Sequence, residues 1–313
     1  MTTMNILLAT YNGESSLREQ LDSLFKQSYQ QWTLIIHDDN STDNTVNIIY
    51  EYQTKYPNKI TYIDDIKSFG SASGNFSFLV EKSKADYVMF CDQDDIWLSN
   101  KVALTLEKMY SLEATYPNKP LLIHTDLTVV DERLNTVADS YWNSQHLHPT
   151  FDRLNDLLVQ NIITGCTIMI NQKLRTKALP IPDGVIMHDW WLGLVASSFG
   201  RIGYLNTSTI LYRQHNNNDT GAVKFNIKTI LHKAISLPKV NISKYIRQAN
   251  LLLELYKDDL SPDQKLLLSD FVKIENSPWL KSKMILFKHK IFKQGMFRNI
   301  GLFISITSGN HKC

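Results

Sequence analysis

The sequence has little cysteine, no long apolar run and no excess of either charge. Its three cysteines, Cys91, Cys166 and Cys313, are odd in number and far apart, which argues against a disulfide framework and favours a reducing compartment. No segment reaches the roughly 18 uninterrupted apolar residues of a membrane-spanning helix. The N-terminus lacks a basic segment, and its apolar stretch is too short for a signal peptide. We therefore expect a cytoplasmic protein.

The near balance of charge also limits the kinds of partner. With 33 lysines and arginines against 31 aspartates and glutamates, the formal net charge is +2, so the chain as a whole has no nucleic-acid signature. A hydrophobic content of 43% is typical of a globular protein. The 313 residues can bury a large core, which predicts one large domain or a domain with an appendage.

Apolar runs and amphipathic segments alternate in the first third of the chain. The runs predict strands at residues 6–9, 34–36, 60–63 and 87–91. Helical spacing of apolar residues predicts helices within 14–29 and 41–52 and around 76–80. Such alternation predicts an α/β fold with a parallel sheet covered on both faces. Sheets of this kind bind ligands beyond the carboxyl ends of their strands.

Three polar clusters follow expected strands, at residues 10–14, 37–43 and 92–95. The last two are strongly acidic, and carboxylates held this close share either protons or a cation. Asp92 and Asp94 lie two positions apart, so their side chains lean the same way and suit a hard divalent ion. A solvated acidic turn that caps the next helix explains this short pattern equally well.

Two stretches in order carry a family resemblance. They read LLATYNGESSLREQLDSLFKQSYQQWTLIIHDDNSTDNT and, some fifty residues later, ADYVMFCDQDDIW. Together they resemble the family 2 inverting glycosyltransferases, over about residues 4–215, and most closely the bacterial rhamnosyltransferase-like branch. The resemblance implies the GT-A nucleotide-diphospho-sugar transferase sandwich. Its nucleotide-binding half would span 1–110, its acceptor-binding half 111–218, and a helical C-terminal appendage 219–313.

The resemblance also implies which residues meet the nucleotide. Asp39 would accept a hydrogen bond from the ring imide of uracil or thymine, which agrees with a carboxylate being an acceptor only. Asn40 stands where many relatives have glycine, and asparagine also tolerates a left-handed turn. For Asp38 and Asp43 we expect turn formation and helix capping. The implied nucleotide-binding residues are Ala9, Thr10, Tyr11, Glu14, Asp39 and Asp92.

A divalent cation, Mn²⁺ or Mg²⁺, is implied at the D-x-D pattern. Asp94 would be the main ligand, with Asp92 and His215 beside it, while Asp95 orients the local structure. The ion would stabilise the departing diphosphate as a Lewis acid. Arg213 would bind the diphosphate, although a salt bridge within the fold explains this arginine equally well.

The segment GVIMHDWWLGLVASSFG supplies a candidate catalytic base. Asp189 falls in the first turn of an expected helix, where aspartate often serves only as a cap. The sequence His188-Asp189-Trp190-Trp191 nonetheless resembles the base motif of the family. A base that activates an acceptor hydroxyl inverts the anomeric centre and requires no second carboxylate nucleophile.

The acceptor side is assigned by resemblance as well. We expect Cys166 to be a small buried residue rather than a nucleophile, because nothing basic accompanies it in sequence. Among the tryptophans, only Trp190 or Trp191 is expected to stack on a sugar, since most tryptophans pack in cores. The implied acceptor-side residues are Gly165, Cys166, Thr167, His188, Trp190 and Trp191.

The character of the chain changes beyond Asn218. Helices are expected at 243–258 and 262–274, with a capping box formed by Ser261 and Gln264. After Glu275 there is no acidic residue, and lysines alternate with large apolar side chains. Such a segment is typical of one that lies on an anionic membrane surface, here at the inner face of the cell membrane. A helix packed on the catalytic domain with its lysines in water is the alternative. No nucleic-acid-binding module accompanies the charge.

These patterns together predict a metal-dependent inverting glycosyltransferase. The donor would be a UDP- or dTDP-sugar, with dTDP-rhamnose as the first choice, and the acceptor a cell-surface polysaccharide or its lipid-linked precursor. A transferase that uses a UDP-hexose or UDP-N-acetylhexosamine is the alternative within the same fold. An inactive sugar-nucleotide-binding scaffold subunit is the alternative from another class.

Overall fold

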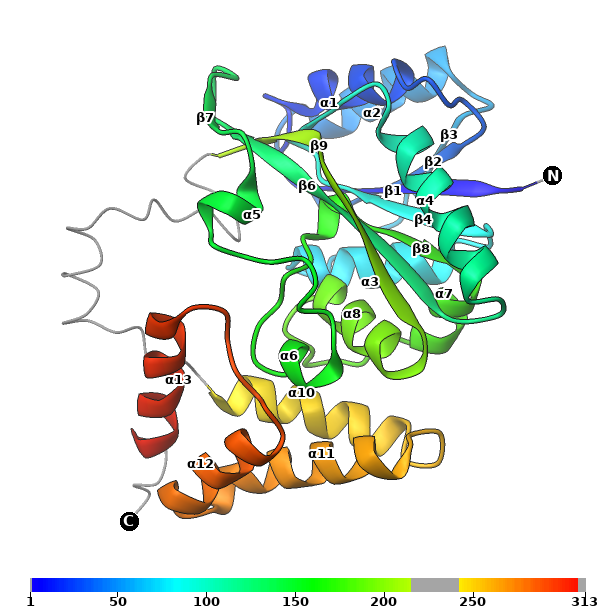
Figure 1. The fold of residues 1–313 in the computed structure, drawn as a ribbon. Coiled ribbons are helices and arrows are strands. Elements are labelled where there is room, and N and C mark those ends of the chain that lie inside the picture. The colour runs from blue at the N-terminus through cyan, green and yellow to red at the C-terminus, as the bar shows by residue number, and fades with distance from the viewer. Residues whose placement is uncertain (1, 215–241, 309–313) are drawn as a thin grey trace.

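The computed structural model describes residues 2–214 and 242–308 (Figure 1). Its first half is the expected parallel sheet, in the order β3-β2-β1-β4. The strands are β1 (Met4–Thr10), β2 (Thr33–Asp38), β3 (Ile60–Tyr62) and β4 (Tyr87–Cys91). The helices that follow the first three strands are α1 (Leu17–Phe25), α2 (Thr45–Lys55) and α3 (Ala72–Lys82).

The second half extends the same sheet with strands of both directions. β8 (Met169–Asn171) runs antiparallel to both β4 and β6 (Leu121–Val130), and so joins the two halves. β6 pairs in parallel with the long β9 (Arg201–Arg213), whose far edge holds β5 (Ile96–Trp97). β7 (Thr136–Ala138) pairs with β6. The sheet is therefore parallel in its first half and mixed in its second.

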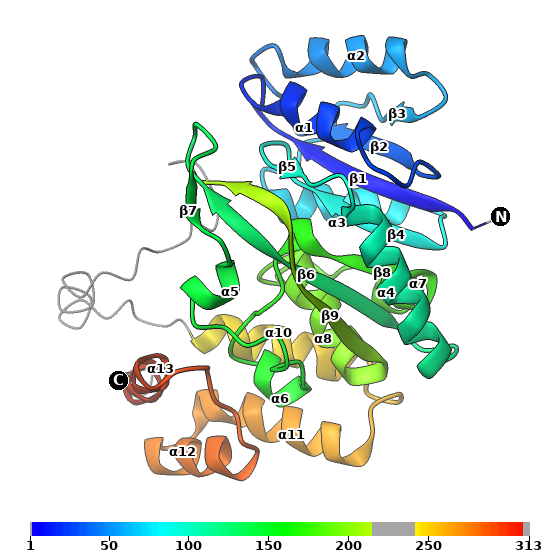
Figure 2. The ribbon, with the colours of Figure 1, turned by 45° about the horizontal axis from the view of Figure 1, so that its top comes forward.

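Helices cover both faces of this sheet (Figures 1 and 2). One hydrophobic cluster unites the sheet with α1, α2 and α4 (Lys101–Thr115). The other contains α3 together with α7 (Gln172–Ala178) and α8 (His188–Phe199). Short helical segments lie in the connections, namely α5 (Tyr141–Ser144), α6 (Leu154–Leu157) and the 3₁₀ turn η1 (Gly165–Thr167).

Helix α8 is buried along nearly its whole length. Its residues from His188 to Ala196 are all buried, whereas the sequence pattern predicts one buried face. The difference arises because the C-terminal helices pack on the side of α8 that faces away from the sheet. Gly200 ends the helix, and a Cβ there would lie 1.6 Å from the carbonyl oxygen of Pro120. The end of α8 therefore lies in close contact with the residue that precedes β6.

The C-terminal helices share a hydrophobic core with α3, α7 and α8. They are α10 (Ile242–Leu255), α11 (Pro262–Val272), the 3₁₀ turn η2 (Lys273–Asn276), α12 (Trp279–Lys288) and α13 (Met296–Ser308). Their buried side chains belong to the hydrophobic cluster that contains α8. The expected capping box is present at the start of α11, where Ser261 and Gln264 bond each other reciprocally. Over residues 2–214 and 242–308, no helix has the length and apolar character needed to cross a bilayer.

Candidate active site

The loops that follow β1 and β2 are joined by hydrogen bonds at the carboxyl edge of the sheet. Asn12, at a positive φ of 47°, accepts from the Thr42 N–H at 2.8 Å, and its own N–H donates to Ser41 Oγ at 2.8 Å. Asp38 accepts the Ser41 N–H, and Asp43 accepts the N–H groups of Glu14 and Thr45. The turn-forming role expected for these two aspartates is confirmed. Neither is the N-cap of α2, which is Asn44.

The candidate nucleotide-binding residues lie on these loops. Thr10 is buried and donates its hydroxyl to Asp38 at 2.7 Å, while the Tyr11 side chain is 56% exposed. Glu14 accepts the Asn44 N–H at 2.8 Å and so braces the two loops. Asp39 accepts the Phe69 N–H through Oδ1 at 2.5 Å. Asn40 adopts a left-handed φ of 64°, as expected. Ala9 is partly buried, one residue before the end of β1.

Gln93 ties the acidic loop to the loop after β1. Its Oε1 accepts the Tyr11 N–H and its Nε2 donates to the Tyr11 carbonyl, both at 2.8 Å. Gly13 leaves room for this amide, because a Cβ at residue 13 would lie 2.3 Å from Gln93 Oε1. The sequence analysis did not single out Gln93, since its partner is 82 positions away.

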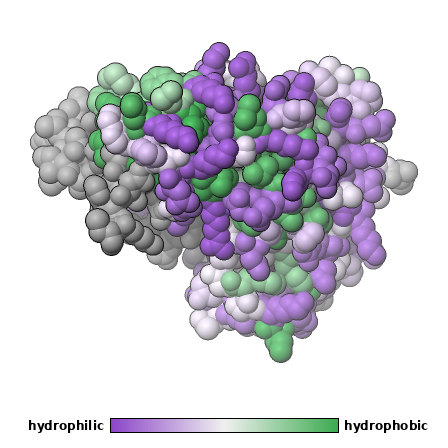
Figure 3. All heavy atoms as spheres, turned by 90° about the horizontal axis from the view of Figure 1, so that it is seen from below, coloured by the Kyte–Doolittle hydropathy of each residue, from purple (hydrophilic) through white to green (hydrophobic). Residues whose placement is uncertain are grey.

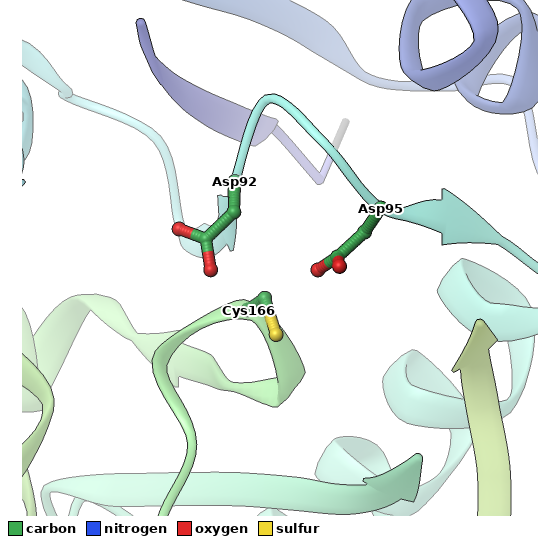
Figure 4. A group of neighbouring side chains, drawn as sticks. All are labelled: Asp92, Asp95 and Cys166. Atoms are coloured by element: carbon green, nitrogen blue, oxygen red, sulfur yellow. The ribbon is translucent and has the colours of Figure 1, made fainter. Parts of the chain in front are cut away.

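The acidic loop after β4 directs two carboxylates toward Cys166 on η1 (Figure 4). Ligand atoms of Asp92, Asp95 and Cys166 lie within 4.8 Å of one another, the group among the described residues that could hold a metal ion. Burial raises the pKa of the Cys166 thiol well above its usual value, so this sulfur stays protonated. Burial, reinforced by Asp94 and Asp92, likewise raises the pKa of Asp95. Carboxylate oxygens are the ligands that hard divalent cations prefer, whereas a protonated thiol is a poor ligand for them.

Asp94 and Asp95 differ in position. Asp94 is partly exposed on the loop and is not part of this three-residue group. Asp95 is fully buried and accepts the Arg213 backbone N–H at 3.2 Å, which agrees with the structural role expected for it. His215, the third expected ligand, lies outside the described residues.

Arg213 holds the acidic loop against the end of β9. Its Nε donates to the Asp94 carbonyl at 3.1 Å, and its Nη1 donates to the Glu132 carbonyl at 2.9 Å. The second guanidinium nitrogen, Nη2, pairs with the Glu19 carboxylate. The salt-bridge role that the sequence left open is therefore present, and a role on a diphosphate stays a prediction.

Asp189 stands in the first turn of α8, 6% exposed. Its carboxylate accepts its neighbour's N–H, that of Trp190, at 2.5 Å, and it also accepts from the Asn161 side chain and the Gly165 N–H. Burial raises the pKa of Asp189 to about 7, and these hydrogen bonds oppose the shift. Asn161 lies four residues before Gly165. The resemblance pointed only to Gly165, Cys166 and Thr167 in this stretch, so the role of Asn161 was missed.

The 3₁₀ turn η1 connects the two halves of the site. Gly165 adjoins Asp189, since a Cβ at that position would lie 3.7 Å from Asp189 Oδ2. The next residue, Cys166, adjoins Asp92 and Asp95. One short segment therefore brings the candidate base and the acidic loop together, as the sequence-based hypothesis requires.

Several acceptor-side expectations need correction. Trp191 has no exposed surface, donates its indole N–H to the Ala178 carbonyl and stacks on Tyr256, so stacking of this ring on a sugar is wrong. Trp190 is also buried and donates its indole N–H to the Leu157 carbonyl at 2.6 Å. The cause is the second apolar layer over α8, which sequence periodicity does not reveal.

The other acceptor-side residues lie behind the site, in or near the protein interior. His188 packs between the rings of Phe76 and Phe90, and burial lowers its pKa to about 3, so the imidazole is neutral. Thr167 and Cys166 have no exposed surface. The expected burial of Cys166 is confirmed, and only Gly165 of η1 is partly exposed.

Comparisons with known proteins agree with this architecture. A solved structure of TarS from S. aureus in complex with UDP-GlcNAc superposes with a TM-score of 0.54 at 16% identity, covering 98% of this chain and 91% of that one. Mannosyltransferase PcManGT from Pyrobaculum calidifontis, in complex with GDP-Man and Mn²⁺, has a TM-score of 0.54 at 14% identity, covering 92% and 86%. These neighbours share the GT-A arrangement expected from the sequence.

Sequence comparison identifies the family. The dTDP-rhamnosyl transferase RfbG of Shigella flexneri is 31% identical over 226 residues, which cover 69% of this chain and 74% of that protein. The family model described as "Glycosyl transferase family 2" matches residues 5–176, which include the loops after β1 and β2, the acidic loop and η1. With that match spanning more than half of its length, the chain belongs to glycosyl transferase family 2 and is a glycosyltransferase of the rhamnosyltransferase-like branch.

Proposed function

We propose that the protein transfers rhamnose from dTDP-rhamnose, with inversion, to a hydroxyl of a cell-surface polysaccharide or its lipid-linked precursor. The observation that carries the reaction is the 3₁₀ turn η1, which adjoins both Asp189 and the acidic loop. The choice of donor is supported by the relative from Shigella flexneri, which is named a dTDP-rhamnosyl transferase. The acceptor would lie at the inner face of the cell membrane.

The nucleoside would bind where the loops after β1 and β2 meet. Oδ1 of Asp39 already accepts the Phe69 N–H, so the imide N–H of thymine or uracil is assigned to Oδ2. The exposed ring of Tyr11 would lie against the base. Glu14 and Thr10 hold the two loops in register through their bonds to Asn44 and Asp38.

Asp94 and Asp92 would hold Mn²⁺ or Mg²⁺, together with His215. Their carboxylate oxygens suit a hard cation, whereas the protonated thiol of Cys166 does not. When bound, the ion would stabilise negative charge on the departing diphosphate. The side chain and the backbone N–H of Arg213 fix the loop that presents the two aspartates, through the Asp94 carbonyl and the Asp95 carboxylate. The guanidinium is also a candidate cation for the diphosphate.

Asp189 would act as the general base. In its ionised form it takes the proton of the acceptor hydroxyl as the oxygen attacks the anomeric carbon from the side opposite the diphosphate. Asn161 and the Gly165 N–H hold the carboxylate in position during this transfer. Because the attack is direct, no covalent sugar–enzyme bond forms and the anomeric configuration inverts.

The elevated pKa of Asp189 predicts a pH dependence. Because the base must be ionised, kcat/KM should fall about tenfold per pH unit below pH 7 and level off above it. Asn161→Ala removes a hydrogen bond that lowers the pKa of Asp189, so its profile should shift upward by roughly one pH unit.

Initial rates from pH 5.5 to 9.5 measure this shift. Asn250→Ala, which alters a partly exposed asparagine paired with Glu254 on α10, serves as the control and should leave the profile in place. An Asn161→Ala profile that loses rate equally at every pH would show that Asn161 does not act through the Asp189 carboxylate.

A panel of donors separates the proposed function from its alternatives. With Mn²⁺ or Mg²⁺ present, we expect dTDP-rhamnose to be turned over at least about tenfold faster than UDP-glucose or UDP-GlcNAc. The UDP-GlcNAc complex of TarS is the observation that keeps the UDP-N-acetylhexosamine alternative in the panel. Faster turnover of a UDP-sugar would show that this nucleotide sugar, and not dTDP-rhamnose, is the donor. Nucleotide binding without turnover of any donor would favour the scaffold alternative.

A further inference from the structure

The outward faces of α12 and α13 carry an unusual concentration of exposed apolar side chains. Eight of them are between 43% and 70% exposed: Trp279, Leu280, Met284 and Phe287 on α12, and Met296, Phe297, Ile300 and Ile304 on α13. We name this surface the α12–α13 face. Isolated exposed apolar residues are ordinary, but a contiguous group of this size marks a surface that meets something.

Helix periodicity shows that each set forms one stripe. Leu280, Met284 and Phe287 follow the spacing i, i+4, i+7, which places them along one side of a helix. The opposite side of α12 carries the buried residues Ile285 and Leu286. A helix on the surface of a globular protein normally has a polar outer side. α12 is apolar on both sides, so packing on the protein interior accounts for only one of them.

Contacts between rings make the two stripes continuous. Phe287 of α12 stacks on Phe303 of α13 with centroids 5.8 Å apart, and its centroid lies 5.4 Å from that of Phe292 in the connection. In Figure 3, hydrophobic side chains gather at the left of the view, beside the grey segment, where α12 and α13 lie. The α12–α13 face is therefore one surface rather than two separate patches.

The charged residues of α12 and α13 themselves have one sign, since no aspartate or glutamate occurs after Glu275. Lys288 pairs with Asp270 of α11 at 2.8 Å. Lys281 and Lys290 are exposed, and Lys283 lies over the Trp279 ring at 4.6 Å. A second copy of the same face would bring like charges together, which is unfavourable. A surface that is apolar and anionic at once fits both features.

The α12–α13 face is also held firmly to the acceptor half. Arg298 of α13 donates to the Gln145 carbonyl at 2.7 Å, and Gln294 donates to the His148 carbonyl at 3.1 Å. These carbonyls lie just after α5, which packs on β6. Burial lowers the pKa of Lys293 to about 8, and its ammonium donates to the Tyr245 hydroxyl at 3.1 Å, so this lysine is not part of the outer surface.

We propose that the α12–α13 face lies on an anionic lipid bilayer, with its apolar side chains in the interfacial region and its lysines among the headgroups. The surface itself is inferred independently of the reaction. Only its use, to keep the enzyme beside a lipid-linked acceptor, rests on the proposed function. Since buried residues of α12 and α13 belong to the core shared with α8, point substitutions test the surface more cleanly than removal of residues 276–313.

Vesicle flotation of the full chain tests the proposal. Vesicles of phosphatidylcholine with phosphatidylglycerol should bind the protein, and binding should fall at least about tenfold on neutral phosphatidylcholine. Met284→Glu and Phe297→Glu should each weaken binding to anionic vesicles by roughly tenfold or more, because a carboxylate replaces a side chain in the interface. Leu255→Glu, at a site 54% exposed on α10 and outside the face, should have no effect.

Two results would overturn the membrane surface. One is a lack of vesicle binding by the original protein, or vesicle binding that Met284→Glu, Phe297→Glu and Leu255→Glu all leave unchanged. The other is a dimer, detected by light scattering, that Met284→Glu dissociates while vesicles do not bind.

Donor hydrolysis in solution is measured in parallel and should be unchanged in Met284→Glu, which shows that this variant is folded. Vesicle binding by a chain that turns over no donor would contradict the proposed reaction and leave the membrane surface standing.

Discussion

Replacing Asp189 with asparagine is expected to lower sugar transfer by about a thousandfold, within the range reported for loss of a general base. The amide keeps the size of the carboxylate and accepts hydrogen bonds through one oxygen, so the fold around α8 is retained. It cannot take a proton from the acceptor hydroxyl. Because Asp189 adjoins the acidic loop only through η1, nucleotide binding should remain within about twofold of the original value.

The same variant should be more stable than the original protein at high pH. A carboxyl whose pKa is raised by folding favours the folded state when protonated, and this contribution is lost as pH rises from about 4 through 7. Asparagine has no charged form, so the variant avoids the free-energy cost of burying an ionised carboxylate at high pH. We therefore expect the free energy of unfolding of Asp189→Asn at pH 8 to exceed that of the original protein, on the order of a few kcal/mol, and the difference to shrink toward pH 4.

Transfer rates, calorimetric nucleotide binding and urea unfolding measure these effects. Asp183→Asn is the matched control, since this exposed aspartate lies in the loop ahead of the same helix, and it should change none of them. Transfer by Asp189→Asn at more than about a tenth of the original rate would exclude Asp189 as the base. Lost nucleotide binding would instead indicate a disrupted site.

Substitution of Asp94 by alanine is expected to lower transfer by roughly 10²- to 10³-fold, and removal of divalent metal by a chelator should have an effect of similar size. The exposed part of the acidic loop would then lack its main oxygen ligand. Binding of Mn²⁺, followed by electron paramagnetic resonance, should weaken in parallel. This second readout separates loss of the cation from loss of chemistry.

Cys166→Ser is the control for the acidic loop. Since the thiol is protonated, its sulfur should contribute little to ion binding, and the serine variant should keep Mn²⁺ affinity within a few fold. The assignment fails if Asp94→Ala binds Mn²⁺ as tightly as the original chain. Strong loss in Cys166→Ser alone would point to a sulfur-containing site.

The parallel half of the sheet was predictable because its strands are apolar runs separated by amphipathic helices. The mixed half was not, since β8 has only three residues and its antiparallel pairing with β4 and β6 depends on partners far along the chain. The acidic loop and Asp189 could be singled out because their residue types suit cation binding and proton transfer. Their proximity through η1 is a property of the fold alone.

The misses in the site have a common physical cause. Gln93 and Asn161 act by hydrogen bonds to Tyr11 and Asp189, and neutral amides give no chemical signal in a sequence. Trp191 was expected at the acceptor because it follows Asp189 in the stretch that resembles the base motif of the family. The C-terminal helices that bury it lie more than fifty residues later.

The pair of hydrogen bonds between Gln93 and the Tyr11 backbone has a thermodynamic consequence. An ion that ordered the acidic loop would then also help to position the loop after β1 for a nucleoside. By reciprocity, a nucleotide bound at the loop after β1 would strengthen the affinity for the ion by the same factor. Donor and cation would in that case be held together, and loss of the ion would favour release of the spent nucleotide.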